Sequence, residues 1–229
     1  MTGLLYGDLV AVLFARADSN YKQMQGVDVW DAERDARNFK GGMPIIAHPP
    51  CRAWGVLKHM AKPKPHEKGL ALFAVEMVRK WGGVLEHPSG SELWKTMGIP
   101  DADMFGDEYG GYTVEIDQYD FGHVANKPTR LYVCGCEMRD LPKMPPKKHG
   151  RAAKSMTGQV PGTTRCTQRE REYTPPELAV WLVETVRRCK PHNAKSQATD
   201  AALSRQVACT DGLGAAVPPA PTFENGDKA

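Results

Sequence analysis

The sequence predicts an α/β fold whose sheet is mostly parallel and is covered by helices. Short apolar runs rich in β-branched residues are bounded by glycines and prolines, which is typical of strands. These runs contain few polar residues, as expected for parallel strands that are buried on both faces. Other segments repeat apolar residues every three or four positions, which indicates amphipathic helices.

The first three predicted strands bring the chain to one edge of the sheet. Residues 9–15 are an uninterrupted apolar run, and residues 27–31 form a short second strand. Residues 44–47 form the third, which must stop at Pro49 and Pro50 because proline donates no N–H and fixes φ. The residues that follow therefore lie at the carboxyl ends of the strands, where open α/β sheets bind their ligands.

The rest of the chain is predicted to contain three helices and three strands. Apolar residues at helical spacing predict a helix over residues 69–81, which two glycines end. Residues 84–87 are the next buried strand and again stop at a proline. The remaining predicted elements are strands at 112–119 and 130–134 and helices at 91–97 and 175–188.

We expect these elements to form a single domain over residues 1–189. A loop-rich insertion at about 135–173 is rich in lysine and arginine. Such a segment either contacts phosphate groups or is a solvated loop. Residues 190–229 shift to alanine, proline, serine, threonine, aspartate and glycine, which predicts a disordered tail.

The composition is that of a globular protein outside membranes. Hydrophobic residues make up 41% of the 229 residues and charged residues 25%, so a sizeable core can form. No apolar run reaches the roughly 18–20 residues that a spanning helix needs. Asp8, Arg16 and Asp18 bound the first apolar run, unlike a secretory signal. We therefore predict a cytoplasmic protein with reduced cysteines, and make no prediction of its oligomeric state.

The cysteines do not predict a metal site. Cys134 and Cys136, with His149 and Cys166 downstream, lack the usual Cys-x₂₋₄-Cys spacing of zinc ligands. Cys134 is then simply the end of a strand.

Cys51 is the first candidate for chemistry, because it directly follows the two prolines. A stiff turn at this point presents a nucleophilic thiol at the sheet edge; the alternative is a buried, inert cysteine. Reactivity depends on surroundings that stabilise the thiolate. Glu86 and His87 end the next strand, so we expect them at the same edge as Cys51.

Taken together, these segments resemble the cytosine-C5 DNA methyltransferase family. Residues 50–55, Pro-Cys-Arg-Ala-Trp-Gly, resemble the family's Pro-Cys-Gln-x-Phe-Ser nucleophile motif. Residues 86–88, Glu-His-Pro, resemble its Glu-Asn-Val motif. Residues 119–133 resemble its tyrosine-glycine and Gln-x-Arg-x-Arg segment, and residues 174–179 the start of its last helix. The order and spacing agree over roughly residues 9–188.

The resemblance implies a Rossmann-like sheet, truncated relative to typical methyltransferases, and methyl transfer to cytosine in DNA. Cys51 would add to carbon 6 of the base and so activate carbon 5. Glu86 would donate a proton to the ring, and Arg130 would stabilise its oxygen. The base would leave the duplex, and residues 52–68 would close over it. A compact enzyme of this sort fits a bacteriophage DNA-modification system.

The resemblance also implies the binding residues and the cofactor. Phe14 and Asp31 would contact S-adenosylmethionine, although the family's Phe-x-Gly-x-Gly motif is missing after the first strand. Another one-carbon donor and a pyrimidine other than cytosine are therefore alternatives. The residues implied to contact the base or its backbone are Pro50, Arg52, Trp54, His87, Lys127 and Thr129.

Two functions of other classes also fit the sequence. The chain could be a catalytically silent DNA-binding relative whose basic segment contacts phosphate and whose cysteine is vestigial. It could instead be an unrelated cysteine hydrolase with His48 or His87 as base, for which no oxyanion-hole signature is present. Glu86 and Arg130 also fit a plain ion pair between a strand-end carboxylate and a surface arginine.

Overall fold

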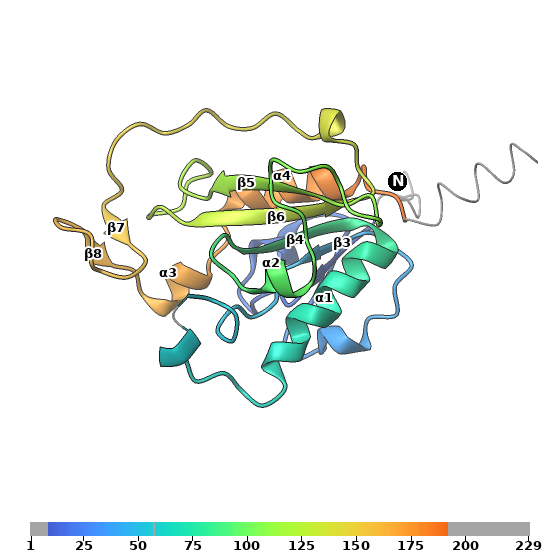
Figure 1. The fold of residues 1–229 in the computed structure, drawn as a ribbon, viewed down its shortest axis with the longest axis horizontal. Helices are drawn as coiled ribbons and strands as arrows, with labels where there is room; N and C mark the ends of the chain where they lie inside the picture. The colour runs from blue at the N-terminus through green and yellow to red at the C-terminus, as the bar shows by residue number, and fades with distance from the viewer. Residues whose placement is uncertain (1–8, 57, 192–229) are drawn as a thin grey trace, which may run out of the picture. The chain divides into compact units, whose positions relative to one another are not determined.

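The computed structural model describes residues 9–56 and 58–191, which are built around one six-stranded sheet (Figure 1). The strand order is β2-β1-β3-β4-β6-β5. The first four strands are mutually parallel, whereas β6 is antiparallel to both β4 and β5. The predicted α/β fold with a mostly parallel sheet is confirmed. The strands are β1 (Val10–Leu13), β2 (Val27–Trp30), β3 (Ile45–Ala47), β4 (Gly83–Pro88), β5 (Tyr112–Asp117) and β6 (Pro128–Cys134).

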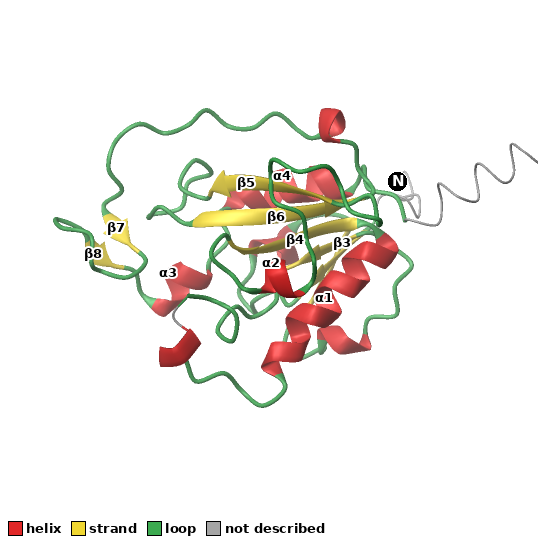
Figure 2. Cartoon of the chain, in the orientation of Figure 1, coloured by secondary structure: helices red, strands yellow, loops and turns green. Residues whose placement is uncertain are grey.

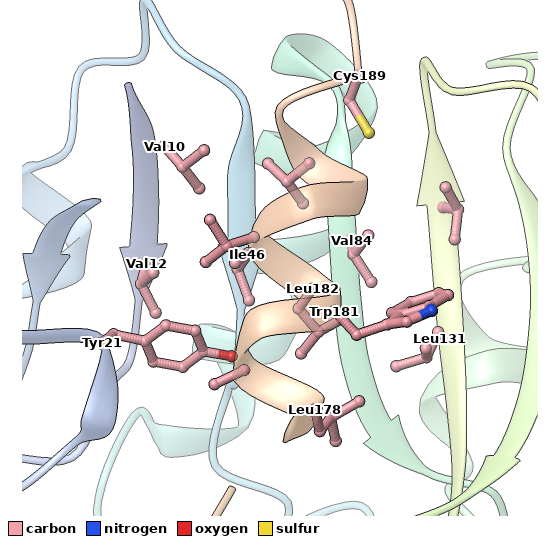
Figure 3. Packing of buried hydrophobic residues seen from close by; sticks show 14 of the residues in the cluster. Val10, Val12, Tyr21, Ile46, Val84, Leu131, Leu178, Trp181, Leu182 and Cys189 are labelled. Carbon is pink, nitrogen blue, oxygen red and sulfur yellow. The ribbon is translucent and has the colours of Figure 1, made fainter. Parts of the chain in front are cut away.

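Two helices cover the two faces of the sheet (Figures 1 and 2). The helix α1 (Glu67–Trp81) packs on one face, against Leu13, Ile45 and Leu85, and α4 (Pro176–Val186) packs on the other. Figure 3 shows α4 packed over the strands, with Leu178, Trp181 and Leu182 among Val12, Ile46, Val84 and Leu131. Alternate residues of β1 thus enter opposite cores, which is why that strand is apolar at every position.

The junction between α1 and β4 depends on two glycines. Gly82 ends α1 with a φ of 75°, and its N–H bonds the carbonyl of Val78. At Gly83, an added Cβ would lie 1.9 Å from the carbonyl oxygen of Ile45. Only glycine therefore allows β4 to pair with β3 at this point, and the predicted helix end is confirmed.

The connections among the first three strands contain short 3₁₀ turns but no α-helix. They are η2 (Asn20–Gln23) between β1 and β2, and η3 (Ala36–Asn38) between β2 and β3. From β1 the chain passes to β2 on one side, and then crosses back to β3 on the other. Such a reversal opens a crevice at the carboxyl ends of β1 and β3, where open α/β sheets bind ligands.

The predicted insertion is irregular, as expected. It contains η5 (Met138–Asp140), a two-stranded sheet of β7 (Lys154–Ser155) and β8 (Thr164–Arg165), and α3 (Gln168–Glu172). Thr167 caps α3 in a capping box with Glu170. Two further short helices are η4 (Lys58–Met60), before α1, and α2 (Leu93–Thr96), after β4.

The predicted tail falls almost entirely on residues 192–229, which lie outside the described residues. Within the described ranges, no helix is both long enough and apolar enough to span a membrane.

Candidate active site at the carboxyl edge of the sheet

A cavity of about 240 Å³ opens at the carboxyl ends of β1, β3 and β4. Its walls come from the segment after β1, the turn after β3, the end of β4, the loop before β6, and the end of α3 with the two residues that follow it. It therefore lies at the crevice that the strand order predicts. The lining residues are Phe14, Ala15, Arg16, Asp18, Ser19, Asn20, Tyr21, His48, Pro49, Pro50, Cys51, Arg52, Glu86, His87, Pro88, Lys127, Arg171, Glu172, Tyr173 and Thr174.

A chain of polar side chains begins in the wall of this cavity. The Tyr21 hydroxyl lies 3.0 Å from Nε2 of His48, and Nδ1 of His48 lies 2.9 Å from Oε2 of Glu86. Gln118 donates from Nε2 to Oε1 of Glu86 at 2.8 Å and to Oγ1 of Thr129 at 3.1 Å. Burial raises the pKa of Tyr21 well above its ordinary value, and the Glu86 carboxylate raises it further. The hydroxyl therefore keeps its proton and can donate a hydrogen bond to Nε2 of His48.

Glu86 is held as a carboxylate. Burial alone would raise its pKa, but the positive charge of Lys127 and the contact with His48 lower it to about 2. At neutral pH Glu86 therefore accepts hydrogen bonds and carries no proton. The resemblance implied that Glu86 donates a proton, but a carboxylate has none to donate. The hydrogen bonds from His48 and Gln118 and the nearby positive charge of Lys127 stabilise this charged form.

Cys51 is exposed to the cavity, in contrast to the other described cysteines, which are buried. Its backbone carbonyl accepts hydrogen bonds from the N–H groups of Trp54 and Gly55, at 3.0 and 2.9 Å, which fix the turn. The surrounding protein partly removes the thiol from water, which raises its pKa. The charge of Glu86 raises the pKa further, and the charge of Lys127 lowers it. The thiol is therefore exposed, unlike the buried cysteine of the alternative interpretation. Cys51 is protonated at rest, however, and must lose its proton before it can act as a nucleophile.

His87 is a neutral, buried imidazole that lines the same cavity. Its exposed fraction is 1%, and its ring lies edge-on to Trp94 with the centroids 5.9 Å apart. Burial lowers its pKa to about 4, against the opposing influences of Glu86 and the Pro50 carbonyl. The Pro50 carbonyl lies near the ring, but neither ring nitrogen makes a contact with the geometry of a hydrogen bond to the described residues. A buried polar group in this condition is a candidate for ligand binding.

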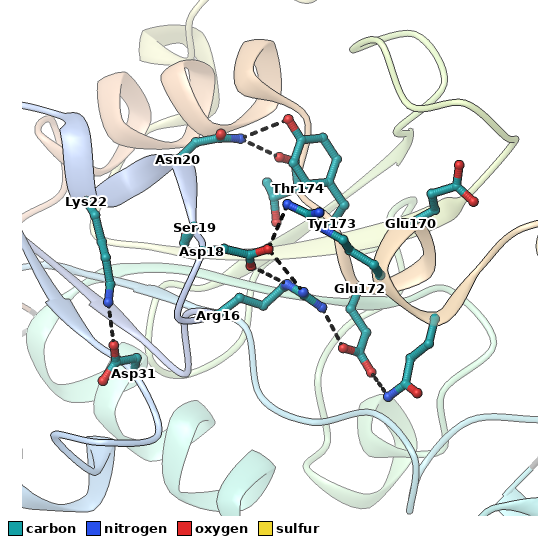
Figure 4. A network of polar contacts seen from close by, with 12 residues as sticks. Arg16, Asp18, Ser19, Asn20, Lys22, Asp31, Glu170, Glu172, Tyr173 and Thr174 are labelled. Atoms are coloured by element: carbon teal, nitrogen blue, oxygen red, sulfur yellow. Dashed lines mark hydrogen bonds and ion pairs between the residues drawn. The ribbon is translucent and has the colours of Figure 1, made fainter.

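An exposed ion-pair network forms the opposite wall of the cavity (Figure 4). Arg16 binds Asp18 and Glu172, each at 2.8 Å, and so joins the segment after β1 to α3. Asn20 donates to the carbonyl of Thr174 at 2.9 Å and to the hydroxyl of Tyr173 at 3.3 Å. The end of the basic insertion is thereby held against the cavity.

The sequence prediction placed Arg130 beside Cys51, and the structure corrects it. The guanidinium binds Glu115 at 2.7 Å and Asp101 at 2.6 Å, away from the cavity lining. Arg130 is paired across the sheet with His87, the neighbour of Glu86, so it points to the face opposite Glu86. The alternative of an ion pair between Arg130 and Glu86 is wrong for the same reason, and Lys127 is the cation that acts on Glu86.

Three other predicted contacts also lie outside the cavity lining. Trp54 is a core residue with an exposed fraction of 1%, and its indole N–H bonds the carbonyl of Lys68. Thr129 is fully buried behind Gln118. Asp31 is bound by Lys22 at 2.7 Å and by two backbone N–H groups. The predicted residues that do line the cavity are Phe14, Pro50, Cys51, Arg52, Glu86, His87 and Lys127.

S-adenosylmethionine does not fit the residues that were predicted to hold it. Asp31 would have to bind ribose hydroxyls, but its oxygens already accept hydrogen bonds within the protein. After β1, where glycines would admit a ligand close to the backbone, Phe14 has a φ of 62° and packs edge-on against Phe73. We therefore assign no step to this cofactor. In the described ranges, no three His, Cys, Asp or Glu side chains are grouped as metal ligands.

Several residues of the site were missed from the sequence. His48 was considered only as the base of a hydrolase, although its place before two prolines marked it as a sheet-edge residue. Tyr21 lies in a segment without periodicity, and Gln118 lies near the end of the predicted strand 112–119. Nothing in the sequence pairs either residue with β3 or β4.

Comparisons of the chain with protein-family models, curated proteins and solved structures found no match.

Proposed function

We propose that this protein modifies carbon 5 of a pyrimidine base in DNA through a covalent adduct with Cys51. The observation that carries the proposal is that Cys51, Glu86 and Lys127 line one cavity although they come from three separate segments. The resemblance to cytosine-C5 methyltransferases implied Cys51 as the nucleophile and Glu86 as a proton donor; the proposal keeps the first role and gives Glu86 the role of a hydrogen-bond acceptor toward the base. A cavity of about 240 Å³ lies below the usual range of about 300–1,000 Å³ for ligand pockets and suits a single flipped base.

The chemistry needs a nucleophile because carbon 5 of a pyrimidine does not react by itself. When Cys51 Sγ bonds to carbon 6, the electron pair of the 5,6 double bond moves toward carbon 5. Carbon 5 then takes a one-carbon electrophile, loses its proton, and the thiolate leaves. The Lys127 charge favours the thiolate that begins this sequence. Methyl transfer is the reaction that the resemblance implies, with a donor other than S-adenosylmethionine because the cofactor residues do not fit it.

The basic insertion supports a nucleic acid as partner. Seven of its cationic side chains are exposed and can contact phosphate, which adds affinity without reading sequence. These side chains are Arg139, Lys143, Lys147, Lys148, Arg151, Arg165 and Arg169.

The geometry disfavours the cysteine hydrolase. A hydrolase would direct Nε2 of His48 at the thiol, but that nitrogen lies 3.0 Å from the Tyr21 hydroxyl. Burial lowers the pKa of His87 to about 4, which makes it a weak base toward the Cys51 thiol, whose own pKa is raised.

Covalent trapping tests the proposed function. DNA that carries 5-fluorouracil or 5-fluorocytosine is incubated with the protein, with and without S-adenosylmethionine, and adducts that survive denaturation are weighed. We expect an adduct with the wild type and with Cys166→Ala, a buried thiol outside the cavity lining, but none with Cys51→Ala. An adduct that requires S-adenosylmethionine would overturn our rejection of this donor. Salt-sensitive DNA binding without any adduct, unchanged by Cys51→Ala, would indicate the silent DNA-binding relative.

A further inference from the structure

Each carboxylate oxygen of Glu86 accepts one hydrogen bond from a neighbouring side chain, and the orientation of each of these donors is itself fixed. Gln118 Nε2 donates to Oε1 of Glu86 and also to Oγ1 of Thr129. The Thr129 hydroxyl in turn donates to the carbonyl of Lys127 at 2.9 Å, so Thr129 can only accept from Gln118. A flipped Gln118 amide would face two acceptors with its oxygen. Gln118 is therefore a donor toward Glu86.

His48 fixes the second oxygen in the same way. The contact between Nδ1 of His48 and Oε2 of Glu86 needs one proton, on either the ring or the carboxyl. If Nδ1 accepted the bond, the Glu86 carboxyl would have to carry the proton. The hydrogen bond from Gln118 and the positive charge of Lys127 both favour the charged carboxylate instead. The proton therefore belongs to His48, whether or not its other nitrogen accepts from Tyr21. Glu86 offers a ligand its remaining lone pairs and no proton.

Two neighbouring groups of the cavity define a hydrogen-bonding pattern. Glu86 is an acceptor, and Lys127 is a donor whose Nζ has a long contact of 3.4 Å with the Tyr173 carbonyl. His87, the next residue of β4, points to the opposite face of the strand and its ring nitrogens are buried, so it takes no part in this pattern. A ligand that complements the two groups presents an N–H donor beside a carbonyl acceptor. Cytosine can offer Glu86 only its exocyclic amino group; its ring nitrogen N3 is an acceptor, and the charge that builds there when Cys51 adds would need a proton that Glu86 does not hold.

We infer that the base taken by this cavity is of the uracil type, with N–H at position 3 and a carbonyl at position 4, rather than cytosine. This inference rests on the proposed function and specifies its substrate. The Cys51 thiol first gives its proton to water. The Sγ–C6 bond then forms, and the electron pair of the 5,6 double bond moves through carbon 5 to the oxygen at carbon 4, giving an enolate. Lys127 stabilises the charge on that oxygen. Water adds a proton to carbon 5, one of the two hydrogens of that carbon then leaves to water, and the electron pair moves back to re-form the 5,6 double bond as the Sγ–C6 bond breaks. The base and the thiolate are released without any oxidant or reductant.

Exchange of the hydrogen at carbon 5 with solvent measures this step without a donor. Matched oligonucleotides carrying a single deoxyuridine or deoxycytidine are incubated with the wild type in D₂O, and deuterium in the released nucleosides is weighed. We expect deuterium to enter uracil about 10- to 100-fold faster than cytosine, the ratio that one unmatched buried hydrogen-bonding group produces. Equal rates, or faster exchange in cytosine, would overturn the inference and leave the proposed function standing. No exchange in either base would overturn the proposed function and the inference with it.

A variant of Glu86 sharpens the comparison between the two bases. Glu86→Gln has nearly the same shape but can donate an N–H to N3 of cytosine. We expect the ratio of uracil to cytosine exchange to fall at least tenfold in this variant, with thermal unfolding measured alongside to show that it is folded. A ratio that stays at the wild-type value would show that Glu86 does not read the base and would overturn the argument. If the variant does not fold, the wild-type ratio alone decides.

Discussion

The cavity has two polar walls that differ in burial and therefore in what they contribute. On one side, Tyr21, His48, Glu86 and Gln118 form a hydrogen-bonded chain at the ends of buried strands. On the other, Arg16 and Asp18 pair with residues of α3 in contact with solvent. Buried polar networks are costly to disturb, whereas exposed ion pairs contribute little to stability. We infer that the first wall is the more costly of the two to disturb.

The largest expected effect is the removal of the carboxylate from the buried wall. Glu86→Ala leaves the donors of His48 and Gln118 unpaired, and we expect the free energy of unfolding to fall by about 3 kcal/mol. Urea denaturation at neutral pH measures the change. The control is Glu115→Ala, which removes an exposed carboxylate from β5. Equal losses in the two variants would contradict the contrast between buried and exposed polar groups.

The buried wall also predicts how stability depends on pH. His87 has a pKa of about 4 in the folded protein and an ordinary value of 6.5, so the unfolded chain binds the proton more readily. Stability is therefore lost as the pH falls from about 6.5 to about 4, by about 3 kcal/mol at about 1.4 kcal/mol per pKa unit. Below pH 4.5, Glu86 adds a further loss down to about pH 2, because its own pKa is lowered in the folded state.

Unfolding of wild type and His87→Phe between pH 7 and pH 4.5 isolates the histidine. The variant is expected to lose less stability than the wild type over this interval. Parallel profiles for the two proteins would show that His87 is not held neutral by burial.

A smaller effect is expected at the outer end of the buried chain. Tyr21→Phe removes the hydroxyl that contacts His48 but keeps the ring in the core, and should cost about 1 kcal/mol. The ratio of uracil to cytosine exchange should not change, because the proton between His48 and Glu86 stays on His48. Loss of that ratio would mean that Tyr21 sets the protonation of the pair.

The smallest effect on stability is expected in the exposed wall. Arg16→Ala removes two solvent-exposed ion pairs, so its unfolding curve should overlay that of the wild type. The contact between the segment after β1 and α3 should nevertheless loosen, which proteolysis of the insertion can detect. A large loss of stability would show that both walls are rigid and would remove the contrast between them.

The same division explains what could be predicted from the sequence. Cys51 and Glu86 were both expected at this edge because Cys51 follows one short apolar strand and Glu86 lies near the end of another, and each strand stops at proline, so burial and chain stiffness fix their position. Arg130 was misplaced because its direction depends on the antiparallel register with β4, which is set by packing across the whole sheet. Asp31 was misassigned because its partner Lys22 comes from an irregular segment.

The remaining site residues depend on loops whose paths are set by tertiary contacts. The Tyr21 side chain reaches His48 only because η2 packs over the sheet beside α4. Gln118 reaches Glu86 from the turn after β5, and its orientation is set by Thr129. Neither contact leaves a periodic or spacing signal in the sequence.

The central claim is that the Cys51 thiol activates carbon 5 of a pyrimidine in this cavity. Its most direct test is deuterium uptake at carbon 5 of a uracil-containing oligonucleotide, measured for wild type, Cys51→Ala and Cys166→Ala. We predict uptake with the wild type and Cys166→Ala and none above background with Cys51→Ala. Uptake that survives Cys51→Ala, or that is missing with the wild type, would contradict the claim.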